Sequence, residues 1–148
     1  MLIETTRFGP VEVDEAKLLE FHGGLLGFPQ HRRFALIQTA LDPVFFWMQS
    51  VDDPGLAFVV CDPLTFVPDY QIPVRHDDLD SLGIRTAADC QVLVVVNKVG
   101  EDLTGNLLGP ILVATDSLRA RQLVLSDKRY TTRHKLVSVN APAMARTA

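Results

Sequence analysis

Short apolar runs separated by turn residues dominate the chain. Each run is rich in Val, Ile, Leu or Phe, and clusters of Gly, Pro and Asp stand between most of them, which is typical of β-strands joined by tight connections. Many short strands with little helix between them favour an antiparallel sandwich or barrel. We therefore predict a mainly all-β fold, a small antiparallel β-barrel-like single domain, with strands at residues 2–6, 10–13, 34–39, 44–50, 56–62, 91–97, 107–115 and 122–125.

Helical patterns are few. Residues 76–82 predict one or two helical turns, because two leucines share a face and a glycine follows as a stop. Residues 14–21 are helical by propensity, although a strand over residues 18–21 fits equally well. Residues 63–66 predict a short helical turn that has proline at its first position.

Three apolar segments are interrupted by polar residues or proline, at residues 47–50, 62–70 and 102–114. An apolar strand carries Asn or Pro where it turns, ends at a sheet edge or meets a partner. None of the three contains a nucleophile paired with a base, or a set of metal ligands. This pattern indicates a β-rich protein that works by binding.

Composition agrees with one soluble domain. The chain has 148 residues, of which 47% are hydrophobic, and this length is enough for one sizeable core. No apolar run approaches the roughly 18 residues of a membrane span, and the first residues show no secretory signal. We therefore expect a cytoplasmic protein, in which Cys61 and Cys90 are buried reduced thiols; a disulfide or redox pair is the alternative.

Charge is unevenly distributed along the chain. The net charge is −4, but acidic residues predominate up to residue 110 and basic residues predominate after it. This asymmetry predicts two electrostatically different surfaces. The alternative is that the basic residues simply form a solvated face.

Candidate chemistry is sparse. His76 with Asp77, Asp78 and Asp80 is the best metal candidate, and a solvated acidic helical turn is the favoured interpretation. The glycines of residues 23–28 lack the Lys-Ser/Thr of a phosphate loop and predict a turn.

Two further patterns have a structural and a functional interpretation. For Asp69 and Tyr70 we favour a structural interpretation over a catalytic pair. In it, Asp69 caps a turn and Tyr70 packs its ring while its hydroxyl stays in water. Residues 128–135 interleave basic and aromatic side chains, which is weak evidence for RNA contact because the acidic body would repel phosphate.

A set of scattered residues occurs in a fixed order and at fixed spacings along the chain. These residues are Ile3-Glu4-Thr5, Arg7-Phe8-Gly9, Phe21 to Phe28, Gln49-Ser50, Ala57-Phe58, Asp62-Pro63, Phe66, Pro68-Asp69-Tyr70, Thr104, Asn106-Leu107, Pro110-Ile111, Gln122, Leu125 and Tyr130. In this order they resemble the flagellar assembly factor FliW family over about residues 2–136. The chain departs from the family pattern at Gly105 and Gly109, where Ala is usual, at Leu26, where Pro is common, and at residues 113–115.

The resemblance implies a compact β-barrel-like fold, with no catalysis and no cofactor. FliW proteins bind newly made flagellin and also CsrA, a small RNA-binding protein that represses flagellin translation. Export of flagellin frees FliW to take up CsrA, so two coupled binding equilibria suffice. We expect a monomer with no direct nucleic-acid or membrane contact, a domain over residues 1–136, and a flexible tail or contact arm over residues 137–148.

Physical chemistry suggests where each partner binds. CsrA presents a basic surface to RNA, so an antagonist is expected to present acid, which here is the stretch from Asp69 to Asp80. The exposed end of flagellin is amphipathic and apolar, and fits a groove framed by apolar and basic residues. The expected partner-binding residues are therefore Phe66, Asp69, Tyr70, Asp77, Asp78, Asp80, Asn106, Leu107, Lys128, Arg129 and Arg133.

Two other functions stay open at this point. One is a small β-barrel ligand-binding protein or enzyme that uses Asp69, Tyr70 and a histidine, which predicts a bound metabolite or metal. The other is an RNA-binding module that uses the basic end, which predicts binding that weakens steeply with salt.

Overall fold

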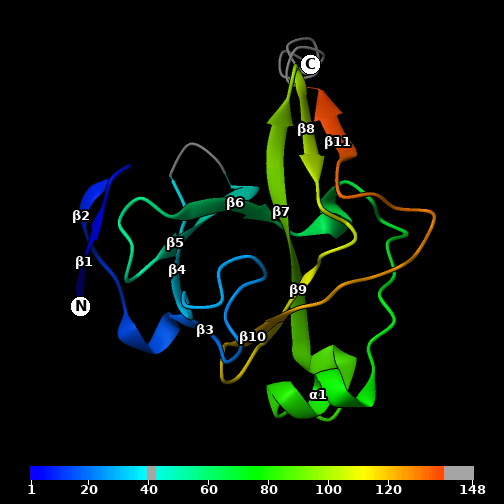
Figure 1. The fold of residues 1–148 in the computed structure, drawn as a ribbon, viewed down its shortest axis with the longest axis horizontal. Coiled ribbons are helices and arrows are strands. Elements are labelled where there is room, and N and C mark those ends of the chain that lie inside the picture. Colours follow the sequence, from blue (N-terminus) through cyan, green and yellow to red (C-terminus); the bar gives the residue numbers. More distant parts are fainter. Residues whose placement is uncertain (40–42, 139–148) are drawn as a thin grey trace.

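A closed β-barrel forms the centre of the molecule. The computed structural model describes residues 1–39 and 43–138, and Figure 1 shows the barrel with a hairpin, a helix and a projecting ribbon around it. The neighbouring barrel strands pair in the order β7-β6-β5-β4-β3-β10-β9, and β9 pairs again with β7 to close the ring. Their bounds are β3 Leu19–Phe21, β4 Arg33–Ile37, β5 Phe45–Ser50, β6 Ala57–Cys61, β7 Cys90–Val99, β9 Ile111–Ala114 and β10 Arg119–Gln122.

Strand β7 connects the barrel to a second structure. Its first residues, Cys90 to Leu93, pair with β9, whereas residues 96–99 pair with β8 (Asp102–Gly105). Strand β11 (His134–Ser138) then pairs with β8, and this ribbon projects beyond the barrel in Figure 1. A separate hairpin of β1 (Leu2–Thr5) and β2 (Gly9–Glu12) lies on the other side.

The helical elements are short. Helix α1 covers His76–Leu82 and ends at Gly83, whose φ of 69° is left-handed, which confirms the predicted helix and its stop. A 3-10 turn at Pro63–Thr65 confirms the predicted turn with proline first. Two further 3-10 turns lie at Glu15–Lys17 and Ala87–Asp89.

The mainly β, barrel-like prediction is confirmed, but several boundaries were wrong. A helix over residues 14–21 does not form: one 3-10 turn leads into β3, as the alternative proposed. The strand predicted over 122–125 lies at 119–122, and the one predicted over 107–115 is reduced to Ile111–Ala114 because residues 106–110 turn. Strands β8 and β11 were not predicted, since pairing of β8 with β7, and of β11 with β8, compensates for their few apolar residues.

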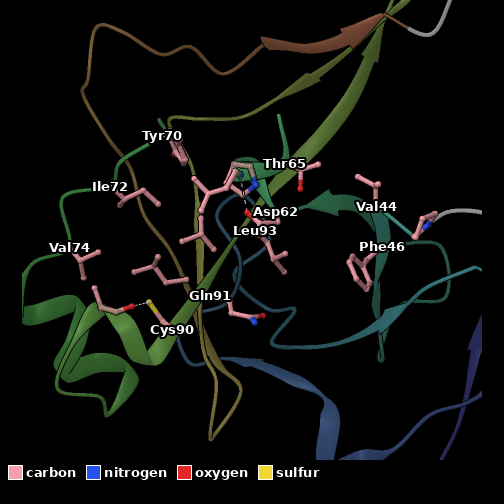
Figure 2. Close-up of a pocket in the computed structure, with 16 residues that line it drawn as sticks. Val44, Phe46, Asp62, Thr65, Tyr70, Ile72, Val74, Cys90, Gln91 and Leu93 are labelled. Carbon is pink, nitrogen blue, oxygen red and sulfur yellow. Dashed lines mark hydrogen bonds between the residues drawn. The ribbon is translucent and has the colours of Figure 1, made fainter. Parts of the chain in front are cut away.

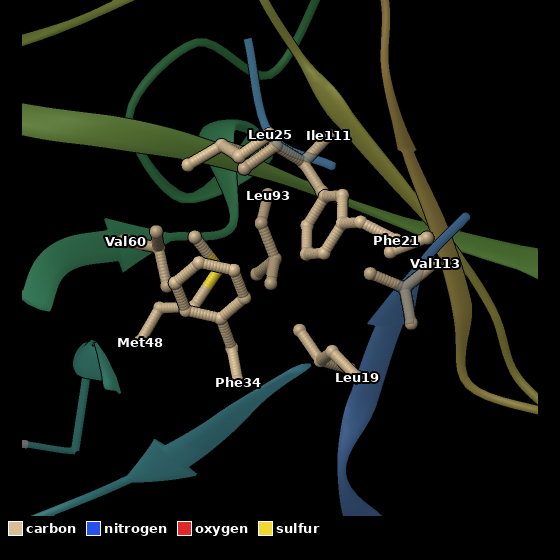
Figure 3. Close-up of a cluster of buried hydrophobic side chains, with 10 residues drawn as sticks. Leu19, Phe21, Leu25, Phe34, Met48, Val60, Leu93, Ile111 and Val113 are labelled. Atoms are coloured by element: carbon tan, nitrogen blue, oxygen red, sulfur yellow. The ribbon is translucent and has the colours of Figure 1, made fainter. Parts of the chain in front are cut away.

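The barrel interior is filled by one cluster of apolar side chains (Figure 3). Phe21, Phe34 and Met48 are fully buried there, and the rings of Phe21 and Phe34 meet edge to face with centroids 5.5 Å apart. Full burial of one such side chain stabilises a fold by roughly 1.5–3 kcal/mol. This core fixes the strands that position the surfaces described below.

The two cysteines are free, as expected, but differ in burial. Cys61 at the end of β6 is buried, whereas Cys90 at the start of β7 is partly exposed. Burial, with a smaller contribution from Asp62, raises the pKa of the Cys61 thiol to about 12. Burial and Asp89 also raise the pKa of Cys90.

We expect iodoacetamide at pH 8 to modify Cys90 and to leave Cys61 unmodified in the native protein, because the thiolate is the nucleophile and Cys61 is inaccessible and protonated. Mass spectrometry of the alkylated peptides measures this, and a denatured sample that labels at both positions is the control. Equal alkylation rates of the two cysteines in the native protein would contradict the structure.

The pKa of Cys61 is higher in the folded than in the unfolded protein. Its contribution to stability is therefore complete below about pH 8.5 and declines as the pH rises toward about 12.

Candidate functional site

An apolar groove lies beside β7, between the ends of β5 and β6 and the segment that leads to α1. Its volume is about 600 Å³. Figure 2 shows Val44 and Phe46 on one side, Ile72 and Val74 on the other, and Cys90 at one end. The lining is largely apolar, and its polar members are Asp62, Thr65 and Gln91. A concave apolar surface of this size is the usual form of a binding site.

The side chains of residues 70–75 alternate between the two sides of this extended segment. Ile72 and Val74 face the apolar groove, whereas Pro73 and Arg75 line a different hollow. The segment is held at its start by Tyr70, whose amide donates to Val67 O at 3.0 Å, and at its end by Arg75, whose amide donates to Asp78 Oδ2 at 3.0 Å. This extended segment therefore forms one wall of the groove.

Tyr70 and Leu107 belong to the core more than to an exposed rim. Leu107 is fully buried, and Tyr70 is 6% exposed with its ring edge-on to Tyr130 at 4.9 Å. The Tyr70 hydroxyl donates to Leu107 O at 2.5 Å, so the expectation of a wet hydroxyl was wrong. Burial, with smaller effects of Tyr130 and Asp127, raises the pKa of Tyr70. Tyr70 still lines the apolar groove, whereas Leu107 is fully buried and is not among the residues that line it.

Replacing Tyr70 by phenylalanine is expected to destabilise the fold by about 1–3 kcal/mol, because the Leu107 carbonyl loses its buried donor while the ring contact with Tyr130 is kept. Chemical denaturation measures the change. Phe66→Leu is a suitable comparison, since it alters the same segment without a buried hydroxyl. A Tyr70→Phe variant as stable as the wild type would show that the hydrogen bond contributes nothing.

Phe66 and Asn106 have local structural contacts. The Phe66 ring stacks on Phe45 at 5.8 Å with an interplanar angle of 19°. Asn106 Oδ1 accepts from the Leu108 amide at 3.2 Å, which holds the turn between β8 and β9. Both side chains are partly exposed, and neither lines the apolar groove.

The acidic stretch divides into exposed and buried carboxylates. Asp69, Asp77 and Asp80 are exposed. Asp77 and Asp80 lie on α1 and are called here the acidic face, whereas Asp69 precedes the extended segment and is close enough to Arg129 to raise the pKa of that guanidinium slightly, in addition to the larger effect of Asp127. Asp78 is 7% exposed and pairs with Arg121 Nε at 3.3 Å, in addition to its bond from the Arg75 amide. The expectation that Asp78 belongs to an open acidic surface was therefore wrong, because this carboxylate fixes α1 to β10.

The basic residues lie apart from the apolar groove. Lys128, Arg129 and Arg133 are exposed, and none of them lines it. Arg129 forms a fork on Asp127, with Nη2 to Oδ2 at 2.8 Å, and its guanidinium lies 5.1 Å from the Tyr130 ring centroid. This hydrogen bonding lowers the pKa of the Asp127 carboxyl. Arg133 instead lines a smaller hollow with Asn106, so the predicted set does not form one frame.

Comparison with known proteins assigns the chain. A sequence model described as FliW protein matches residues 2–136. The flagellar assembly factor FliW of Treponema denticola is 34% identical over 93% of this chain and 95% of its own, and that of Syntrophotalea carbinolica is 41% identical over 88% and 94%. The chain belongs to the FliW family. A crystal structure described as the flagellar assembly factor FliW superposes with a TM-score of 0.84 at 30% identity, covering 92% of this chain and 96% of that one.

Two departures from the expected FliW pattern lie at tight positions. A methyl group at Gly109 would stand 2.7 Å from Asn106 Nδ2, and one at Gly105 would stand 3.1 Å from Leu136 Cδ1. Glycine at these positions therefore lets the Asn106 side chain and strand β11 approach the backbone closely. The substitutions alter local packing and leave the FliW fold in place.

Metal chemistry finds no support in the part of the chain that the structure describes. No group of His, Cys, Asp or Glu side chains is placed there to hold an ion, and the three aspartates of α1 point to different surroundings. No helix among these residues is long and apolar enough to cross a membrane. An enzyme built on Asp69 and Tyr70 is not supported either, because the tyrosine hydroxyl is committed to a core carbonyl.

The sequence did not predict the apolar groove as a site. Its lining includes Val44, Phe46, Ile72, Val74 and Cys90. Alternation along residues 70–75 was a usable signal, since every second side chain is apolar. Phe46 and Cys90 lie in β5 and β7, and Val44 lies just before β5. The sequence of these strands indicates burial but not which of their faces is left uncovered. Of the tail predicted over residues 137–148, residues 137 and 138 belong to β11, and residues 139–148 lie outside the described residues.

Proposed function

We propose that this protein is a cytoplasmic flagellar assembly factor that binds flagellin and the translational regulator CsrA in exchange. Membership of the FliW family supports the proposal most directly, because its relatives carry the name flagellar assembly factor. The molecule also presents two surfaces of different chemistry, an apolar groove and an acidic face.

Each surface suits one partner. The apolar groove has the volume and lining to receive an apolar segment of flagellin. Asp77 and Asp80 have no ion pair among the described residues, so they are free to meet the basic surface by which CsrA would bind RNA. Contact with CsrA in this way needs no nucleic acid.

The regulation follows from coupling of the two bindings. If bound flagellin weakens CsrA binding by a typical coupling free energy of about 1–3 kcal/mol, then CsrA weakens flagellin binding by the same amount. Export of flagellin would then release the protein to capture CsrA and allow flagellin translation. Residues 70–75 connect the two surfaces, since they line the groove and lead directly into α1 with Asp77 and Asp80.

Co-purification of the tagged full-length chain from its own cells, with mass spectrometry of the proteins recovered, tests the function. We expect flagellin and CsrA in separate complexes. Recovery of neither partner with well-folded protein would overturn the proposal. Recovery of both in one ternary complex would show binding without exchange.

A further inference from the structure

Strand β10 has one partner fewer at its end than at its start. On one side Arg119 and Ala120 pair in parallel with Glu20 and Phe21 of β3. Strand β3 stops there, and the chain turns away, with the Gly24 amide donating to Phe21 O at 3.0 Å. Beyond Gln122 the chain therefore has lost its neighbour on that side.

The opposite side of the same segment stays attached. The Leu123 amide donates to Pro110 O, and the Leu125 amide donates to Leu108 O, both at 2.8 Å. Because alternate residues of an extended chain point their amides to opposite sides, the Val124 amide faces away from these bonds. Within the described residues no hydrogen bond involves the Val124 backbone or the Ser126 amide. Residues 123–126 are thus an open strand edge.

A groove follows this edge. One hollow of about 390 Å³ is lined by Leu26, Arg75, Asp78 and residues 121–126, and a second of about 220 Å³ continues it along residues 120–122. Both hollows include Leu26, Arg121 and Gln122, so together they form one elongated site, called here the edge groove. Helix α1 forms one wall, and the turn of residues 22–26 forms the other.

The edge groove combines apolar side chains with polar and charged ones, among them Arg75, Arg121 and Asp78. Val124 is 77% exposed and Leu26 is 51% exposed, which leaves two large apolar groups without cover. Arg121 is paired with Asp78, whereas Arg75 has no ion pair within the described part of the chain. An occupant therefore needs unpaired backbone groups, an apolar side chain and an acidic side chain.

We propose that the edge groove binds an extended segment of flagellin, which adds to the sheet beside residues 123–126 in the position that β3 vacates. Strand addition supplies main-chain hydrogen bonds, while adjacent hollows select side chains. The unpaired Arg75 offers a contact to an acidic residue of that segment.

The edge groove and the apolar groove lie on opposite sides of residues 70–75, so one flagellin segment reaches both by crossing a single extended chain. The inference rests on the proposed function, because it names a second contact of the same partner.

Binding of purified flagellin to the full-length chain tests the proposal. We expect Val124→Glu to weaken the flagellin complex at least tenfold, since it replaces an apolar contact and repels an acidic segment. The matched control is Val99→Glu, an exposed valine at 44% in the β7–β8 ribbon, for which we expect unchanged affinity. Both variants should keep the wild-type Tm, because both side chains are exposed.

Hydrogen exchange gives a second readout that side-chain changes do not affect. The Val124 amide should exchange rapidly in the free wild-type protein and at least tenfold more slowly in the flagellin complex, because strand addition supplies its acceptor. Wild-type flagellin affinity in Val124→Glu together with an unprotected Val124 amide would overturn the edge-groove proposal and leave the function intact. Failure of the wild type to bind flagellin would overturn both.

Discussion

Reversing the charge of Asp77 and Asp80 to lysine should weaken CsrA binding by at least about 100-fold, which corresponds to roughly 2.7 kcal/mol, and leave flagellin binding unchanged. Both carboxylates are exposed on α1 and have no ion pair among the described residues, so the lysines would place like charges against a basic partner. Calorimetric titration of each partner at about 0.1 M salt measures the effect. Asp78 is left intact because its reversal would break the contact with Arg121 and confuse binding with stability.

The control changes charge by the same amount elsewhere. Glu4→Lys combined with Glu101→Lys alters two exposed acids outside α1, and should leave the affinity for CsrA within about twofold because screening removes interactions beyond roughly 10 Å. If the α1 variant loses flagellin and keeps CsrA, the two surfaces have been assigned to the wrong partners. Equal losses of CsrA in both double variants would indicate a nonspecific effect of net charge.

Phe34→Ala is expected to cost about 3–5 kcal/mol of folding free energy, which is a large part of the total for a domain of this size. Phe34 is fully buried in the barrel core, where its ring packs on Phe21 at 5.5 Å, and the cavity left by alanine cannot close within a ring of paired strands. Thermal and chemical denaturation measure the loss.

Leu36→Ala provides the comparison for this effect. It lies two residues further along β4, with 38% of its side chain exposed, so we expect a cost below about 1 kcal/mol. Similar losses in the two variants would mean that the barrel interior does not dominate stability. The more conservative Phe34→Leu should fall between them.

The sequence predicted the elements that local pattern specifies. Apolar runs with turn residues at both ends identified β4, β5 and β6, and the acidic start and glycine stop identified α1. Strand β8 escaped prediction because its register depends on β7, and β11 escaped because it pairs with β8, which is distant in sequence. The helix predicted from the propensity of residues 14–21 was also wrong, because pairing of β3 with β4 and β10 outweighs that helical preference.

The site was predictable only in part for the same reason. Residue type correctly gave exposed acids at Asp77 and Asp80, but Asp78 lies on the inner side of α1, where Arg121 meets it. Tyr70 and Leu107 are apolar in character, and only the fold shows that one lines the groove and the other lies in the core. The edge groove follows from the early end of β3 and therefore from topology.

The parallel pairing of β3 with β10 has a consequence for the order in which the protein assembles on the ribosome. The hairpins from β4 to β7 can form as soon as they emerge, but Glu20 waits for Arg119, which is synthesised about a hundred residues later. Until then the barrel has an open seam between β3 and β7, with apolar interior exposed. The barrel thus closes only after Arg119 and Ala120 have been translated, and the binding surfaces, which depend on β9 and β10, become available as a set.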